Sequence, residues 1–180
     1  MKTKKIVKMI KEIQKTAKKA KQHKSLQNIH VQNNIVYVSD LFRVLCIKTS
    51  LPDGTYIIND DELFRIADCD NEAPNFGSVA LHFNTDFRIT FNYENGPMKH
   101  VALCEIFKMI DTPFNIDFTD NILNQADGEI DMRYRLNDIT KPVIFTFMCE
   151  DYRCLLMIMP LKGNDLKIYD SAFNSSDFLR

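Results

Sequence analysis

The 180-residue sequence predicts an α+β protein in which two helices pack on antiparallel sheets. Three observations support this class. An amphipathic segment stands at the N-terminus, short β-branched and aromatic runs separated by turn residues follow it, and a second apolar helical segment divides these runs into two series. The order helix, about four strands, helix, about four strands predicts a similar unit twice. The two halves share no obvious sequence identity, so this repeat is one of architecture only.

Residues 2–24 are predicted to form the first helix. At about 100° per residue, six apolar side chains share one face, namely Ile6, Met9, Ile10, Ile13, Ala17 and Ala20. Six lysines share the opposite face, here called the lysine stripe: Lys4, Lys8, Lys11, Lys15, Lys18 and Lys19. We expect the apolar face to dock on a sheet. The lysine stripe then faces solvent or a polyanion.

The first series of strands is predicted at 28–31, 35–38, 43–48 and 55–58. Turn residues separate these strands at Asn33-Asn34 and at Pro52-Asp53-Gly54. After them, Asn59-Asp60-Asp61 resembles a helix N-cap and predicts a short helix over 62–67. Residues 68–78 are predicted to be a polar connector.

The second series begins with a predicted strand pair at 79–83 and 87–93, joined by Asn84-Thr85-Asp86. A well-buried helix is predicted over 98–110, after the break at Asn95-Gly96-Pro97. Further strands are expected at 114–118, 129–136, 143–147 and 154–159. Residues 163–180 form a polar C-terminal tail.

Composition narrows the class of protein. With 45% hydrophobic residues, the chain can bury the core of one domain. Five cysteines, an odd number without a C-x-x-C pair, predict buried small hydrophobes in a reduced cytoplasmic setting. No apolar run approaches the roughly 20 residues that cross a bilayer, and the N-terminus lacks the apolar region of a signal peptide. We therefore expect no membrane partner.

Charge is divided unevenly along the chain. Residues 1–24 contain ten of the 23 basic residues and one of the 24 acidic residues, for a net charge of +9. The other 156 residues contain 13 basic and 23 acidic residues, for a net charge of −10. Such asymmetry indicates one basic surface on an acidic body, which favours contact with nucleic acid. A solvated amphipathic helix is the alternative interpretation.

The C-terminal hairpin carries a family resemblance. Its first strand is Lys141-Pro142-Val143-Ile144-Phe145-Thr146-Phe147, and after Glu150-Asp151 its second ends in Met157-Ile158-Met159-Pro160-Leu161. This pattern resembles the end of bacterial DNA polymerase III β sliding clamps, where a "PVLI" strand, an acidic turn and a "YLIMPM" strand close the last domain. Residues 38–45, with Asp40 and Arg43, are similar to that family's "Ala-Thr-Asp-Gly-His/Tyr-Arg-Leu-Ala" segment.

The resemblance covers roughly residues 1–162 and implies a clamp-like domain over that range, followed by the tail. Three features depart from the family. Known bacterial clamps carry three such domains per chain, Leu41 and Phe42 replace the small Gly and the His or Tyr, and a tail follows Gly163. Because one chain supplies about one domain, a ring implies a homo-oligomer of about six chains, as in a phage or mobile element with a reduced replication set.

The same resemblance implies two kinds of partner. The helices of the family line a central hole, so the lysine stripe would contact the backbone of duplex DNA without sequence preference. Two segments of the family converge on a hydrophobic pocket that captures DNA polymerase and other replication proteins. The corresponding residues here are Leu41, Arg43, Val44, Met157, Met159, Pro160 and Leu161. Ordinary strand core is the alternative for these residues.

Catalysis is not expected. The acidic clusters Asp60-Asp61-Glu62, Asp68/Asp70 and Glu150-Asp151 stand at predicted caps and turns, and no His or Cys has metal-ligand spacing. We therefore predict a protein that is not an enzyme, with no cofactor and no metal. Two other classes remain open: a clamp-fold interaction protein that modulates a replication factor without encircling DNA, and a small α+β DNA-binding accessory protein. Oligomeric mass distinguishes the clamp from both.

Overall fold

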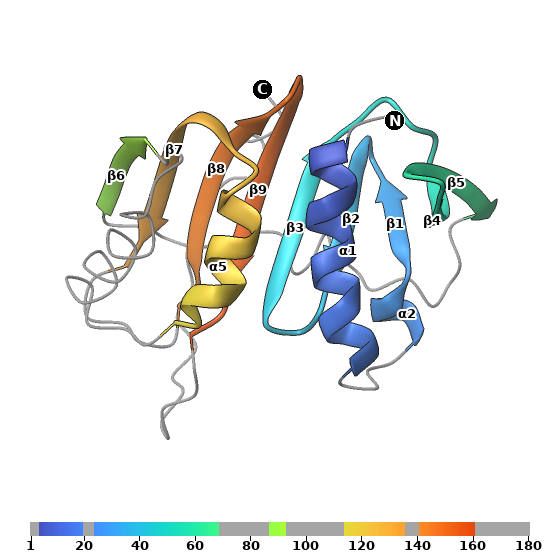
Figure 1. Ribbon diagram of the computed structural model, residues 1–180, viewed down its shortest axis with the longest axis horizontal. Coiled ribbons are helices and arrows are strands. Elements are labelled where there is room, and N and C mark those ends of the chain that lie inside the picture. The colour runs from blue at the N-terminus through green and yellow to red at the C-terminus, as the bar shows by residue number, and fades with distance from the viewer. Residues whose placement is uncertain (1–3, 20–23, 69–86, 93–113, 136–140, 161–180) are drawn as a thin grey trace.

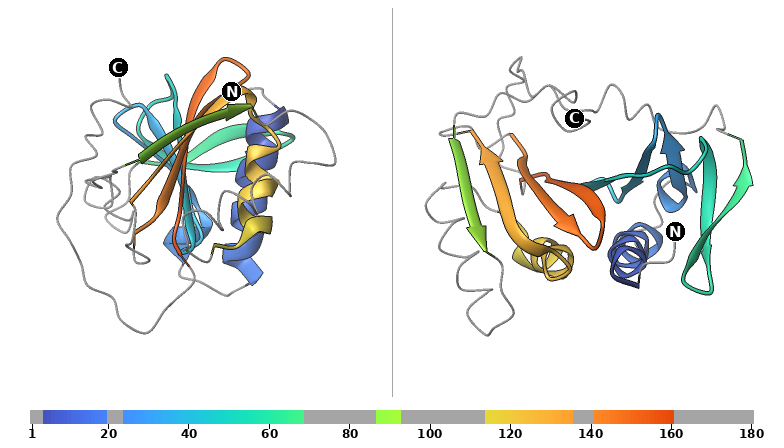
Figure 2. Two further views of the ribbon diagram at one scale, coloured as in Figure 1. Left: turned by 90° about the vertical axis from the view of Figure 1, so that its left-hand side faces the viewer. Right: turned by 90° about the horizontal axis from the view of Figure 1, so that it is seen from above.

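A computed structural model of the chain describes residues 4–19, 24–68, 87–92, 114–135 and 141–160. In these residues nine strands form one antiparallel sheet, in the order β5-β4-β1-β2-β3-β9-β8-β7-β6. Two helices lie side by side across one face of this sheet (Figures 1 and 2). The α+β class with helices packed on antiparallel strands is confirmed.

The helices of the described residues are α1 (Lys4–Lys19), the short α2 (Lys24–Gln27) and α5 (Ile116–Leu123). The strands are β1 (Ile29–Gln32), β2 (Ile35–Ser39), β3 (Arg43–Lys48), β4 (Gly54–Asn59), β5 (Glu62–Ala67), β6 (Phe87–Asn92), β7 (Asp127–Tyr134), β8 (Val143–Cys149) and β9 (Tyr152–Ile158). None of the described helices is long and apolar enough to cross a membrane.

The sheet consists of two halves that follow the chain. Strands β1 to β5 form one half and strands β6 to β9 form the other. The halves join where β3 pairs antiparallel with β9, with Arg43 opposite Ile158 and Leu45 opposite Leu156. Because this pairing is continuous, one core runs beneath both halves.

The helix face of the sheet contains the larger part of this core. Ile6, Met9, Ile10 and Ile13 of α1 are fully buried in it, and Ile122 and Leu123 of α5 are buried in the same cluster. Burying each such side chain contributes about 1.5–3 kcal/mol. The predicted apolar face is therefore confirmed for Ile6, Met9, Ile10, Ile13 and Ala17, whereas Ala20 lies outside the described residues.

The opposite face of the sheet has a smaller apolar cluster. It consists of Ile35, Tyr37, Cys46, Ile144, Leu155 and Met157. Strand alternation explains the two clusters, because successive side chains point to opposite faces. Cys46, Cys149 and Cys154 are all buried free thiols, and burial raises the pKa of Cys46 and of Cys149 to about 12. These three cysteines are therefore poor nucleophiles near neutral pH.

The strands of the first series agree with the sequence within one or two residues. The turn Asn33-Asn34 joins β1 to β2 with φ of 52° and 62°. Two successive left-handed residues make a turn whose twist matches the flanking strands, and asparagine adopts this conformation readily. The predicted turn is confirmed.

The short helix predicted over 62–67 is wrong, because this segment is strand β5. Asp60 and Asp61 have φ of 46° and 61°, so they form a two-residue hairpin turn and not a helix cap. The hairpin pairs Ile57 with Phe64 and Ile58 with Leu63. The backbone of this segment forms its hydrogen bonds with β4. A helix of six residues would have to form them within itself, and so short a helix is only marginally stable.

The strand predicted over 114–118 is also wrong, because α5 occupies most of it. Asn115 caps this helix, and its side-chain oxygen accepts a hydrogen bond of 3.2 Å from the Phe118 amide. Thr119, Ile122 and Leu123 are buried with the spacing of a helix face. The other expectations at 69–78, 79–83, 98–110 and 163–180 lie outside the described residues.

The strands β7, β8 and β9 occupy the regions predicted for them. β7 begins two residues earlier than the expected 129–136, and β8 and β9 extend to the turn at Glu150-Asp151. Glu150 has φ of 54° in this turn. The C-terminal hairpin that carries the family resemblance is therefore confirmed as two paired strands.

Candidate functional site

The lysine stripe lies on the outward side of α1. All six of its members are exposed, while Ile6, Met9 and Ile13 point into the core. Seen from above in Figure 2, α1 and α5 both project from the same side of the curved sheet. The stripe therefore occupies the crest of one of two neighbouring ridges. Its charge is unusually dense, because α1 contains seven lysines and one glutamate.

Carboxylates flank this basic ridge. Lys11 forms an ion pair of 2.6 Å with Asp61, which stands in the β4–β5 turn. Lys5 forms an ion pair with Asp127 at the start of β7. The hydrogen bonds from these lysines hold the pKa of Asp61 and the pKa of Asp127 below their usual range. Both carboxylates are therefore ionised near neutral pH.

The neighbouring ridge, α5, has the opposite charge. Its eight residues include two acids, Asp117 and Asp120, and no base. Asp117 and Asn121 are exposed, and Asp120 is half-buried. A polyanion that lay across both helices would meet lysines on one and carboxylates on the other.

Arg43 links the two helices from beneath. Its side chain is 1% exposed, and its Nε donates a hydrogen bond of 2.8 Å to Asp40, which is completely buried. One terminal nitrogen donates to the Phe118 carbonyl of α5 at 2.9 Å. The other donates to the hydroxyl of Thr16 and the carbonyl of Glu12 in α1, at 3.0 and 3.2 Å.

This placement corrects the expectation for Arg43. The guanidinium also lies over the Phe118 ring, 4.5 Å from its centroid. All of its contacts are therefore inside the protein, and the side chain is not available to a bound peptide. A buried arginine with a paired carboxylate and several acceptors is a structural link, because its charge is compensated on every side.

Several of the other residues predicted for the partner pocket lie on neighbouring segments of β3, β9 and the chain beside them. Val44 pairs with Met157 across β3 and β9, and the Met159 amide donates a hydrogen bond of 2.8 Å to the Phe42 carbonyl. Leu41 is 62% exposed and Met159 is 38% exposed. Pro160 is half-buried, and Leu161 lies outside the described residues.

Phe42 belongs to this surface and was missed from the sequence. It is 45% exposed, and its ring lies 5.9 Å from that of Phe118. Its position in the sequence between Leu41 and Arg43, two residues predicted for the pocket, could have identified it. We call Leu41, Phe42 and Met159 the junction patch, because they lie where the two halves of the sheet meet.

The turn that carries the junction patch has an unusual backbone. Leu41 has φ of 67°, a left-handed backbone conformation that residues other than Asn, Asp and Gly rarely adopt. One oxygen of Asp40 accepts hydrogen bonds from the amides of Phe42 and Arg43, at 3.2 and 3.0 Å. The buried Asp40 therefore holds Leu41 in a strained backbone conformation.

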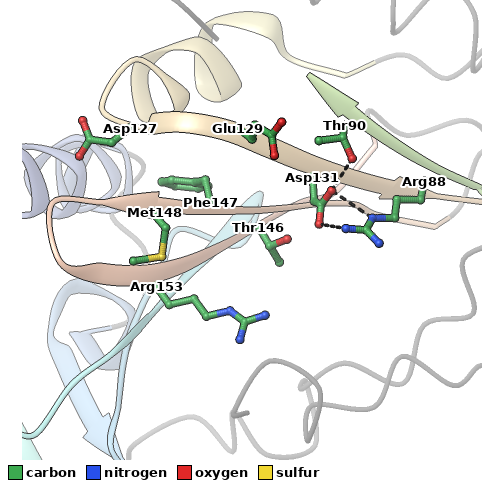
Figure 3. A pocket seen from close by; sticks show the side chains of 9 residues that line it. All are labelled: Arg88, Thr90, Asp127, Glu129, Asp131, Thr146, Phe147, Met148 and Arg153. Carbon is green, nitrogen blue, oxygen red and sulfur yellow. Dashed lines mark hydrogen bonds and ion pairs between the residues drawn. The ribbon is translucent and has the colours of Figure 1, made fainter. Parts of the chain in front are cut away.

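A hollow of about 440 Å³ lies on the far face of β6 to β9. Figure 3 shows Arg88 and Thr90 of β6 reaching Asp131 of β7, with Thr146 and Arg153 nearby. Asp131 accepts two hydrogen bonds from Arg88, at 3.0 and 2.5 Å, and one from the Thr90 hydroxyl at 2.7 Å. The bond from Arg88 lowers the pKa of Asp131.

The chemistry of this hollow is that of a polar surface. Three carboxylates, Asp127, Glu129 and Asp131, line it, and Asp131 is ionised and held in place; among the lining residues that the structure describes there is no His, Cys or Ser. Throughout the described part of the chain, no three or more His, Cys, Asp or Glu side chains are grouped so that they could hold a metal ion. Two acidic pairs of the sequence, Asp60-Asp61 and Glu150-Asp151, stand in hairpin turns.

Comparison with known proteins gives structural likeness only. No protein-family model and no curated protein matches the sequence. The β clamp of Helicobacter pylori in complex with 3,4-difluorobenzamide matches 88% of this chain at 11% identity, with a TM-score of 0.55. The DNA polymerase III β subunit of Thermotoga maritima matches 88% at 14% identity, with a TM-score of 0.51. The β chain from Streptococcus pneumoniae matches 84% at 10% identity, also with 0.51.

These likenesses concern the fold. The chain spans 64% of the length of each of the three bacterial proteins. TM-scores of 0.51 to 0.55 show a common architecture of helices on an antiparallel sheet, and sequence identities of 10–14% carry no residue roles. The chain therefore has the fold of bacterial DNA polymerase III β clamps.

Proposed function

We propose that this protein is a sliding-clamp-like replication protein that contacts duplex DNA through the lysine stripe. The observation that carries the proposal is the exposure of all six lysines of the stripe on a helix that covers the sheet of a clamp fold. The apolar side of the same helix is fully engaged in the core. The outward side is thus exposed to solvent, with Lys11 in an ion pair with Asp61.

The physical chemistry of the stripe suits a moving contact. Lysine ammonium groups attract phosphates as point charges and read no base edges, so the contact has little sequence preference. Each phosphate contact releases a counterion, and the logarithm of affinity falls with the logarithm of salt concentration by about 0.9 per contact. A clamp that slides needs this kind of contact, because tight base-specific binding would stop it.

We propose that several copies of the chain assemble into a ring around DNA. The chain spans 64% of the length of the β clamps that it matches. The mechanism is topological and requires no chemistry, so we propose that the protein is not an enzyme. Light scattering in the presence and absence of DNA tests this assembly. A monomer that binds a replication protein but does not remain on circular DNA would instead support a clamp-fold modulator.

The DNA contact is tested by removing charge from the stripe. We expect Lys8→Gln with Lys15→Gln to weaken binding to a mixed-sequence duplex and to reduce the salt slope by about 2. Fluorescence anisotropy across a salt series measures both quantities. The matched control is Lys48→Gln with Arg65→Gln, which removes the same charge from exposed positions on β3 and β5. Equal effects of the two pairs, or no effect of the first, would contradict a DNA contact at α1.

We further propose that the junction patch binds DNA polymerase or other replication proteins. Leu41 and Phe42 are large apolar side chains that are exposed to solvent. The neighbouring Met159 side chain is flexible enough to pack against varied apolar side chains of a partner. The turn that presents them is fixed by the buried Asp40, so little conformational entropy is lost on binding. An extended or helical apolar peptide segment is the partner that suits this surface.

Leu41→Asn separates binding from stability at this patch. Asparagine accepts the φ of 67° more readily than leucine, so the free energy of unfolding should rise by about 1 kcal/mol. Affinity for a clamp-binding peptide from a DNA polymerase should fall, as for loss of an interface anchor, by about 1–3 kcal/mol. Ile66→Thr on β5 removes another exposed apolar side chain and serves as the control. Unchanged peptide affinity in Leu41→Asn would remove the patch from consideration.

A further inference from the structure

We infer that the carboxylates beside α1 confine phosphate contact to one narrow strip of the molecule, the five lysines Lys4, Lys8, Lys15, Lys18 and Lys19, and exclude the neighbouring ridge α5. This inference rests on the proposed DNA contact and specifies which lysines make it. It assigns Asp61, Asp127 and Asp117 as the residues that limit the footprint.

The strip is defined by its position around the helix. At about 100° per residue, the lysines of α1 follow one another in the order Lys18, Lys11, Lys4, Lys15, Lys8, Lys19 and Lys5. Lys11 and Lys5 lie near the two edges of this series, and each has a carboxylate partner on the sheet. Within the described part of the chain, the five other lysines form no ion pair. Four of these five, Lys4, Lys15, Lys8 and Lys19, lie between the two edges, and Lys18 lies just beyond Lys11 around the helix but in its last turn.

Asp61 closes the first edge. It stands at the tip of the β4–β5 hairpin and is 57% exposed, with its carboxylate 2.6 Å from the ammonium of Lys11. A phosphate that approached Lys11 would have to displace a carboxylate of the same sign. Because Lys11 lowers the pKa of Asp61, this competing charge remains in place well below neutral pH.

Asp127 and α5 close the second edge. Asp127 accepts hydrogen bonds from Lys5 and from the Glu150 amide, so both turn and helix fix its position. Beyond it, α5 presents Asp117 and Asp120 and no cation. Phosphates that moved from α1 toward α5 would lose attraction and meet repulsion over the width of one helix.

The footprint follows from these edges. Five lysines contact at most about five phosphates, so the salt slope per protomer should not be steeper than about −4.5. A duplex is wider than one helix. Its axis should therefore lie toward the α1 side of the two-helix face, not centrally between α1 and α5.

Neutralising a flank should widen the strip. Asp61→Asn frees Lys11, and asparagine is well suited to the φ of 61° at this position, so the hairpin is preserved. We expect affinity for a mixed-sequence duplex to rise roughly two- to fivefold and the salt slope to steepen by about 1. Asp117→Asn should raise affinity without a comparable change in slope, because it removes repulsion and frees no lysine.

Asp53→Asn is the matched control, since Asp53 is exposed in the β3–β4 loop and has the same charge. Urea denaturation of every variant checks that the fold is retained. If the wild type binds the duplex and all three variants bind equally, the inference is overturned while the DNA contact stands. If the wild type does not bind the duplex at any salt concentration, the proposed function and the inference both fail.

Discussion

The two helices that cover the sheet, α1 and α5, bury similar side chains and expose opposite charges. Isoleucines of both lie in one core cluster, and Arg43 donates hydrogen bonds to the backbone of both. Outward, α1 has seven lysines and one acid, whereas α5 has two acids and no base. Their inward faces are therefore equivalent in the fold, and their outward faces are not equivalent for a ligand.

This difference separates what the fold requires from what a function would require. Packing on the sheet constrains only the inward stripe of each helix, and the outward residues vary without loss of the core. Likeness to β clamps consequently says nothing about the charge of either helix. The density of lysine on α1 is independent support for the proposed DNA contact, and the acidity of α5 is an argument against contact by both helices.

The largest effect is expected where the two helices share a residue. Asp40→Ala would leave the buried guanidinium of Arg43 without its carboxylate, and this should lower the free energy of unfolding by about 3–5 kcal/mol. It would also remove the acceptor for the amides of Phe42 and Arg43. Urea denaturation followed by circular dichroism measures the loss.

Asp53→Ala is the control for this change, because Asp53 is an exposed carboxylate in a loop, and substitution there should alter stability by less than about 0.5 kcal/mol. A loss equal to that of the control would show that the Asp40–Arg43 pair does not connect α1, α5 and the junction patch energetically. The comparison between the helices would then rest on their packing alone.

The contrast between α1 and α5 also explains which parts of the fold could be predicted. Lysine and isoleucine alternate at helical spacing over four turns of α1, so its periodicity is unambiguous. The eight residues of α5 are too few for a clear period, and Phe114, Ile116 and Phe118 alternate as a strand would. Asn115 was the informative signal, since its side chain caps the helix.

Three further residues show the same limit of prediction from sequence. Asp60 and Asp61 suit both a helix N-cap and a hairpin turn, and only the pairing of β5 with β4 decides between them. Arg43 was expected in the partner pocket with ordinary strand core as the alternative, and it is buried opposite Ile158, because a single sequence does not reveal which face of a strand is covered by helices. Tertiary contacts with Thr16 and Phe118 settle its burial.

The smallest expected effect concerns the ion pairs at the flanks of α1. Asp61 and Asp127 have a pKa lowered from 3.8 by hydrogen bonds from Lys11 and Lys5. Because the pKa is lower in the folded state, each carboxylate contributes its stability fully above pH 3.8 and loses it as the pH falls through the folded value. The free energy of unfolding should thus decline on acidification below pH 3.8 through these two groups.

Asp127→Asn isolates one of these contributions. The variant cannot bind the proton that the wild-type carboxylate gains on unfolding in acid, so its stability should fall less steeply with decreasing pH. Asparagine retains an oxygen that can accept the hydrogen bond from the Glu150 amide, and this preserves the turn. Urea denaturation from neutral pH into this acidic range measures the slope. Parallel curves for wild type and variant would mean that Lys5 does not hold Asp127 in solution, and the second edge of the lysine strip would then depend on the carboxylates of α5 alone.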